Sequence, residues 1–229
     1  GIATVNVTAP SFHPPLSWKG NLAWDRTLVT SLILTLEASF IEVQRALNTY
    51  DLNLKPIGTN PDGRIRYSGA FTATTSGARG TSNSNSYSSP ANYKNAGFGD
   101  VLYLTNTNKG GGHDFTVSLK RQMKNNWGAS FSYTRSHYTE VSPMTSSVAQ
   151  SNYNGRKITN PNDDVASTSN TNVPDRVVGT LNYQFKLFNN APTNLALIYQ
   201  GRTGHNYSWV FFGDANGDGF TWNDQFYVP

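Results

Sequence analysis

Long stretches of alternating apolar and polar residues constrain this chain most. In the clearest stretch, alternate positions from Leu32 to Phe40 are apolar, and Thr35, Glu37 and Ser39 lie between them. A period of two is typical of a β-strand, whose successive side chains point to opposite faces. Similar alternation runs through six segments: Trp18–Asp25, Thr30–Gln44, Asp114–Met123, Trp127–Val141, Arg176–Leu187 and Thr193–Phe212. The sequence therefore predicts an all-β protein with unusually long strands.

The polar face of these strands separates two kinds of all-β protein. A half-buried strand of a soluble sandwich would also alternate, but here the polar positions hold Gly, Ser, Thr and Asn rather than Lys and Glu. Charged residues are 14% of the chain, aromatic residues 13%, and the mean hydropathy is −0.49. A transmembrane β-barrel combines an apolar, aromatic lipid face with an uncharged polar lumen. We therefore expect a segment of a large antiparallel transmembrane β-barrel.

This interpretation assigns a face to each alternating position. The residues expected to face lipid are Leu34, Leu36, Phe131, Leu181, Tyr183, Leu195 and Leu197. Those expected to face the lumen are Thr35, Ser132, Asn182, Gln184 and Asn194. We expect residues 1–229 to form one unit in the bacterial outer membrane, in contact with lipid and lipopolysaccharide.

Connection lengths predict an orientation. Asp25–Leu28, Lys124–Asn126 and Phe188–Pro192 are short, whereas Ser142–Pro174 is long and polar. Outer-membrane barrels have short periplasmic turns and long outer loops, so the strand beginning at Trp18 is expected to run inward and its successors to alternate in direction.

The middle region, Arg45 to His113, lies between an outward and an inward strand, so it is expected to be one excursion on the outer side. Its Ser/Asn/Gly-rich part, Thr81 to Asn95, fits a loop. Arg64–Ala70 and Val101–Leu104 are expected to form a short hairpin above the membrane. The alternative is that the region hides two more membrane strands.

The strand count predicts that the chain is incomplete at both ends. It provides about six strands, or eight with that alternative, and a further strand is expected to begin near Trp222. The smallest barrels close with about eight strands, and an open edge in lipid leaves backbone groups unpaired. We therefore expect the barrel to continue outside this sequence, and the chain not to fold alone.

Several motifs resemble the carboxy-terminal barrel of Oar-type TonB-dependent outer-membrane receptors. They occur in matching order over nearly the whole chain and are most specific near its end. The motifs are Trp18–Ala23, Asp51–Leu54 followed by Asp62–Arg64, Leu104–Gly110, Ser132–Thr134, Pro174–Val177, Tyr199–Gly204, Tyr207–Ser208, Asp214–Gly219 and Asn223–Pro229. One departure is Asp175, where the family pattern has His before Arg176.

The resemblance implies a barrel of about 22 strands with a plugged lumen. It implies transport of a scarce or large substrate across the outer membrane, driven by TonB through an amino-terminal part that is not in this sequence. The plug and the final barrel strands are also not in it. Selectivity for the transported substrate would reside in the plug and the outer loops.

The chain offers little catalytic chemistry. It has no Cys, which excludes zinc–thiolate sites, disulfides and cysteine nucleophiles. Its four histidines have no metal-ligand spacing and are expected to be isolated loop residues, and Asp163–Asp164 is expected to be solvated. No catalytic or cofactor-binding residues are predicted, so we expect no enzyme. The net charge of +4 comes from scattered basic residues, so no nucleic-acid partner is expected.

One segment resembles a calcium loop. Asp214, Asn216 and Asp218 place oxygen ligands at alternate positions, and Gly219 permits a sharp turn. Phe220 is expected to add a backbone carbonyl, and Asp224 replaces the usual Glu one position early. The alternative is a polar turn in which Asp and Asn bond their own backbone. The sequence thus predicts a candidate Ca²⁺ site at Asp214, Asn216, Asp218, Phe220 and Asp224.

Two other classes of function remain open. One is a small self-contained outer-membrane barrel serving adhesion or passive diffusion. The other is a secreted β-sandwich binding module, which predicts solubility without detergent.

Overall fold

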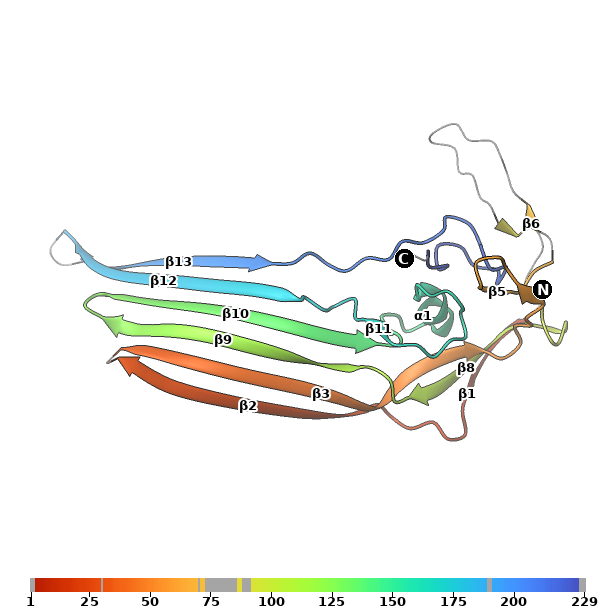
Figure 1. Cartoon of the computed structure of the whole chain (residues 1–229), viewed down its shortest axis with the longest axis horizontal. Coiled ribbons are helices and arrows are strands. Elements are labelled where there is room, and N and C mark those ends of the chain that lie inside the picture. Colours follow the sequence, from red (N-terminus) through yellow and green to blue (C-terminus); the bar gives the residue numbers. More distant parts are fainter. Residues whose placement is uncertain are drawn as a thin grey trace, which may run out of the picture.

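The computed structural model describes residues 3–29, 31–69, 71–72, 86–87, 92–188 and 191–226. Regular structure in these ranges is nearly all β, and the one helix among them, α1 (Ala149–Gly155), has seven residues. A nine-stranded sheet is accompanied by two two-stranded sheets (Figure 1). No helix in the described ranges is long and apolar enough to cross a membrane. The predicted all-β class is confirmed.

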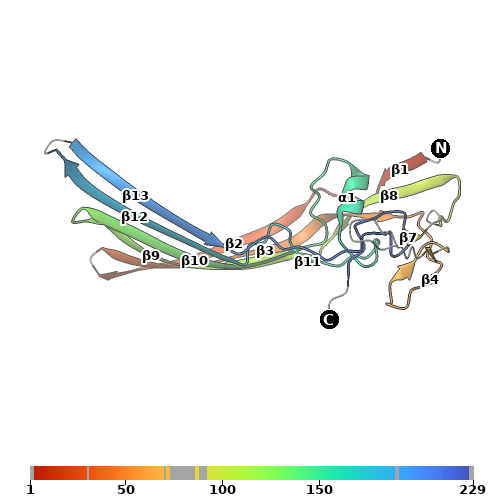
Figure 2. The ribbon, with the colours of Figure 1, turned by 90° about the horizontal axis from the view of Figure 1, so that it is seen from above.

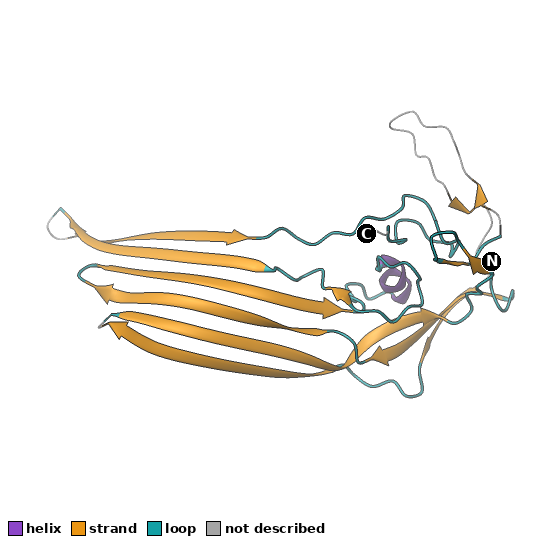
Figure 3. Cartoon of the chain, viewed as in Figure 1, coloured by secondary structure: helices purple, strands orange, loops and turns teal. Residues whose placement is uncertain are grey.

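Six long strands form the body of the large sheet, and all neighbours among them are antiparallel (Figure 3). In spatial order they are β2 (Leu16–Val29), β3 (Leu32–Asp51), β9 (Gly111–Lys124), β10 (Trp127–Glu140), β12 (Asp175–Leu187) and β13 (Ala191–Arg202). Each one coincides with a predicted strand, although the bounds differ. β3 continues beyond Gln44, and β13 stops ten residues before Phe212. The predicted start of β3, Thr30, lies outside the described residues.

The register joins the apolar positions of all six strands into one face. Residues directly opposite each other in a ladder point to the same side of a sheet. One row across the sheet is Trp24, Leu36, Val117, Tyr133, Val177 and Gly201, and the next is Arg26, Leu34, Leu119, Phe131, Gly179 and Tyr199. The seven residues predicted to share a face do share it, and the five predicted to oppose them lie on the other face.

Nothing in the described part of the chain covers this apolar face. Phe131 is 53% exposed and Leu197 57% exposed, and no second sheet packs against the strands (Figure 2). The buried apolar side chains lie elsewhere, where Leu54 and Tyr67 pack with Ile65 and Tyr93 at the loop end of the sheet. The sheet therefore has no hydrophobic core of its own in the described ranges.

The opposite face carries side chains that bond across the strands. Asn21 donates to Glu37 Oε1 at 2.6 Å, the hydroxyls of Thr116 and Thr134 lie 2.8 Å apart, and those of Ser130 and Thr180 lie 2.6 Å apart. Thr35 also donates to Asp25. These hydrogen bonds, whose donors are amides and hydroxyls, satisfy a polar surface without the ion pairs that usually coat a soluble sheet.

Short turns and long connections lie at opposite ends of the sheet (Figure 1). The short turns join β2 to β3, β9 to β10 and β12 to β13. The expectation of a turn at Asp25–Leu28 is wrong, because β2 continues to Val29 and pairs with β3 throughout. The connection from Ser142 to Pro174 is long, as predicted, and it contains α1 and the short strand β11 (Ser167–Thr168).

The β9–β10 turn consists of Asn125 and Asn126, at φ values of 54° and 68°. Two successive left-handed residues are typical of the type I′ turn, whose twist matches that of the flanking strands.

We expect Asn126→Val to lower the free energy of unfolding by about 1–2 kcal/mol, because a β-branched side chain is strained at positive φ. Asn126→Gly should leave it nearly unchanged. Denaturant titration of both variants checks this, and equal losses in the two would contradict the strained-turn explanation.

The middle region adds no strand between β3 and β9, because these two pair directly from Leu32–Arg121 to Glu42–Gly111. The alternative of two more membrane strands between them is therefore wrong. The excursion is also shorter than predicted, since β8 (Phe98–Thr107) continues the line of β9 and keeps its register against β3. A glycine pair interrupts this line. A Cβ on Gly111, at φ 125°, would lie 2.6 Å from the Ile41 carbonyl oxygen.

The predicted hairpin between Arg64–Ala70 and Val101–Leu104 is also wrong. Val101–Leu104 belongs to β8, which pairs with β3 and, in parallel, with β1 (Ala3–Thr8). The residues near Arg64 form a separate hairpin of β4 (Gly58–Thr59) and β5 (Ile65–Arg66). A second small hairpin joins β6 (Phe71–Thr72) to β7 (Ser86–Tyr87). Ala70 and most of the predicted loop Thr81–Asn95 lie outside the described residues.

Candidate functional site

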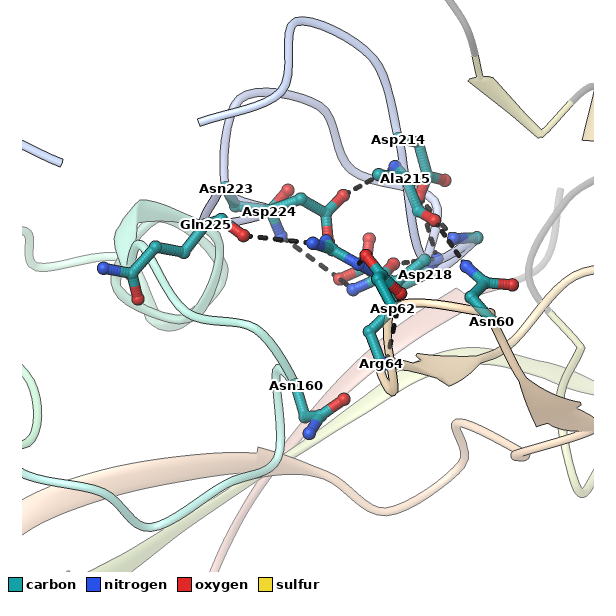
Figure 4. A network of polar contacts seen from close by, with 12 residues as sticks. Asn60, Asp62, Arg64, Asn160, Asp214, Ala215, Asp218, Asn223, Asp224 and Gln225 are labelled. Carbon is teal, nitrogen blue, oxygen red and sulfur yellow. Dashed lines mark hydrogen bonds and ion pairs between the residues drawn. The ribbon is translucent and has the colours of Figure 1, made fainter. Parts of the chain in front are cut away.

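The predicted calcium residues all lie in one loop that follows β13, at the end of the sheet with the long connections (Figures 1 and 4). The expected strand near Trp222 is absent among the described residues there, where Asp224 and Gln225 make only isolated bridges. Asp, Asn and Gly explain the local shape. Asn216 Oδ1 accepts the Asp218 N–H at 2.8 Å and Asp218 Oδ1 accepts the Phe220 N–H at 2.9 Å, as Asx turns do.

Asp214 lies at the centre of the turn. Its Oδ1 accepts the N–H groups of Gly217 at 2.5 Å and Asp218 at 3.2 Å, and its Oδ2 accepts that of Gly219 at 2.9 Å. The two glycines have φ values of 79° and 94°, a left-handed conformation that residues with a Cβ rarely adopt. The backbone therefore wraps around the Asp214 carboxylate.

Asp218 is buried as well, at 1% exposure. Two amide groups donate to its Oδ2: Asn216 Nδ2 at 3.3 Å and Asn223 Nδ2 at 3.1 Å. The structure thus brings together the three residues that the sequence predicts as the first ligands, and it adds Asn223. Phe220 lies in the same turn, and its ring packs edge-on against Tyr153, with 6.4 Å between centroids.

Asp224, the predicted last ligand, is engaged differently. Its Oδ2 accepts the Ala215 N–H at 2.7 Å, and its Oδ1 lies 3.2 Å from Arg64 Nη1. The Arg64 guanidinium also donates to the Gln225 carbonyl at 3.1 Å and to Asp62 at 2.8 Å, and it stacks 4.9 Å from the centre of the Phe211 ring. Asp224 is therefore the ion-pair partner of a buried arginine (Figure 4).

Backbone contacts fasten the loop to the rest of this end of the molecule. Tyr67 N–H donates to the Asn216 carbonyl at 2.8 Å, and Asn60 Nδ2 donates to the Ala215 carbonyl at 2.9 Å. Ile158, in the connection after α1, donates to the Asn223 carbonyl at 3.0 Å. Two segments distant in the sequence, residues 60–67 and the connection after α1, thus converge on the loop.

The loop holds more negative charge than its surroundings balance. Burial, together with the nearby carboxylates of Asp214 and Asp224, raises the pKa of Asp218 to about 8. Burial likewise raises the pKa of Asp214, and it raises that of Asp224 to about 6 although Arg64 opposes the shift. In the described ranges Arg64 is the only ion-pair partner of these three carboxylates.

Two residues of this site, Arg64 and Asn223, are not among those predicted from the sequence. Arg64 is 160 positions from Asp224, so no local spacing connects them, although Asp62–Arg64 does appear among the motifs of the resemblance. Asn223 is adjacent to a predicted ligand, but amides occur in most polar turns and carry no signal alone.

Two smaller expectations are wrong. His113 and His137 are not loop residues, because they lie opposite each other on β9 and β10 with ring centroids 5.9 Å apart. Asp164 is not simply solvated, since it accepts from Thr107 at 3.1 Å and lies 3.5 Å from Lys109 Nζ.

The carboxylate and amide oxygens of the loop are the kind of ligands that bind a hard metal ion. No group of three or more His, Asp or Glu side chains in the described residues is arranged to hold a metal, so any ligand set in this loop must include amides. A polar cavity of about 330 Å³ lies beside the loop and is lined by residues that include Glu140, Arg156, Lys157, Tyr207 and Gln225.

Comparisons of the chain with protein-family models, curated proteins and solved structures find no match.

Proposed function

We propose that this chain is a segment of an outer-membrane β-barrel that belongs to a TonB-dependent transporter. The observation that carries the barrel proposal is the exposed apolar face that runs without a break across six long antiparallel strands. In water such a face would need a covering layer, whereas in a barrel lipid covers it.

The length of the apolar band supports the same proposal. On β10, Trp127 and Arg135 lie on the apolar face near its two ends, and eight residue steps between them span about 27 Å at ~3.4 Å per residue. Membrane barrels have an apolar band about 25 Å tall, flanked by aromatic residues. Arg121 stacks 3.8 Å from the Trp127 ring at one end, and Arg135 pairs with Asp175 at 2.7 Å at the other. Charged groups thus occur where the band would meet water.

The TonB-dependent class rests on the resemblance of the sequence motifs. The resemblance also implies that the parent barrel is plugged and that it moves a scarce or large substrate. The position of the Asp214–Asp224 loop among the long connections agrees with an outer, substrate-facing end.

Cysteine labelling tests the location and the orientation, because this chain has no Cys of its own. In the full-length protein in its native bacterium, Asn206→Cys lies in the long connections and Asn126→Cys in a short turn. A membrane-impermeant maleimide should label the first in intact cells and the second only after the outer membrane is permeabilised. Equal labelling of both positions in intact cells, or recovery of the protein in a soluble fraction, would refute the membrane proposal.

Conductance separates the transporter from a passive barrel. We expect the full-length protein in a planar bilayer to show no steady current, because a plug closes the lumen. Steady open-channel currents would favour passive diffusion instead.

A further inference from the structure

We propose that the loop from Asp214 to Asn223 binds a divalent cation, calcium by its chemistry, through two carboxylates and two amides: Asp214, Asn216, Asp218 and Asn223. The proposal does not depend on the transport function. It also differs from the set expected from sequence spacing, because Asp224 is already paired with Arg64.

A divalent cation would balance the charge of the loop. Asp214, Asp218 and Asp224 are at most 5% exposed, and among the described residues one guanidinium, that of Arg64, faces them. Three carboxylates and one guanidinium leave a formal charge of −2. Buried charges are retained in proteins when they are paired or coordinate a metal, and one divalent ion balances this charge.

Asn223 provides an independent indication of a ligand. Its side chain is 3% exposed, and its Oδ1 is a buried oxygen with no hydrogen-bond partner. Buried amide oxygens are nearly always satisfied. The amide adjoins Asp218, to which its Nδ2 donates at 3.1 Å, and rotating the terminal amide by 180° exchanges the nitrogen and the oxygen. After that rotation Oδ1 would take the position from which Nδ2 now donates to Asp218 Oδ2.

The hydrogen bonds at Asp218 mark where the ion would lie. Two amide N–H groups, from Asn216 and Asn223, converge on Asp218 Oδ2. Their partial positive charges stabilise this oxygen at the position where a bound cation would stabilise it with a full charge. The backbone N–H groups that hold Asp214 leave its Oδ2 with a free lone pair, since that oxygen accepts one bond. The ligands are all oxygen atoms of a flexible loop, which Ca²⁺ prefers, whereas Mg²⁺ demands a stricter octahedron.

Terbium luminescence and hydrogen exchange test the proposal on the full-length protein in detergent after chelation. Tb³⁺ bound in the loop should be sensitised by Trp222, and added Ca²⁺ should displace it. Calcium should also slow amide exchange in residues 214–224 of the wild type. Asp218→Asn keeps an oxygen for the Phe220 N–H but removes a charge, and it should weaken Ca²⁺ binding by at least about tenfold.

Two further variants sharpen the result. Asn223→Asp adds a charged ligand and should bind Ca²⁺ at least about tenfold more tightly, with faster exchange than wild type in its absence. Asp163→Asn, outside the loop at the same end of the molecule, should behave as wild type. If Ca²⁺ neither displaces Tb³⁺ nor slows exchange in the wild type, or if Asp218→Asn binds as tightly as the wild type, the proposal is wrong and the loop is only a polar turn.

Discussion

Replacing Arg64 by methionine should detach the Asp214–Asp224 loop from the β4–β5 hairpin, with a loss of about 3–5 kcal/mol in the free energy of local opening. The reason is the carboxylate left behind. The side chain of Asp224 is 0% exposed and that of Arg64 is 3% exposed, so methionine fills the space but leaves a buried charge without its partner. The loss of the bond to the Gln225 carbonyl adds to the effect.

Hydrogen exchange over residues 214–225 measures this opening, and two comparisons isolate its cause. Arg135→Met removes an exposed pair with Asp175 and should change stability by no more than about 1 kcal/mol. The double variant Arg64→Met/Asp224→Asn should recover much of the loss, because the buried charge is gone. If the double variant opens as readily as Arg64→Met, the uncompensated carboxylate is not the cause.

Arginine at the centre of the apolar face should destabilise the folded protein far more than arginine one residue away. We expect Phe131→Arg to lower the free energy of unfolding in lipid by about 2–4 kcal/mol, the cost of a charge at the lipid-facing midplane, and Ser132→Arg to lower it much less. The two positions are adjacent on β10 and point to opposite faces. Strand propensity and strand position are thus nearly the same in the two variants.

Unfolding of the full-length protein from lipid vesicles by guanidinium measures both variants. Ser132 lies opposite Ser118 and Val178 in the neighbouring strands. In the proposed barrel its face lines a water-filled lumen, where a charged side chain stays hydrated. Equal losses would show that both faces meet the same environment. A larger loss at Ser132 would place that face against lipid and reverse the proposal.

The sequence by itself determined the strands and their two faces. Alternation depends only on the two-residue repeat of an extended chain, so Leu34, Phe131 and Leu197 could be assigned to one face without knowledge of their neighbours. The short connection at Lys124–Asn126 was equally predictable, because it lies between two clearly alternating segments. Strand ends were less accurate. β3 continues to Asp51 because β8 supplies a pairing partner there, and β13 stops at Arg202 although apolar residues follow.

Only the tertiary structure decided which distant groups meet. The local spacing of Asp214, Asn216 and Asp218 predicted that they would share a turn, since each bonds backbone within a few residues. Asp224 belongs to the same segment, yet its ion-pair partner is Arg64. The two residues are 160 positions apart in the sequence and meet only in the folded chain. Periodicity records how a residue lies relative to its own strand or turn. Which charge compensates another depends on how the long connections pack, and side-chain spacing carries no information about that.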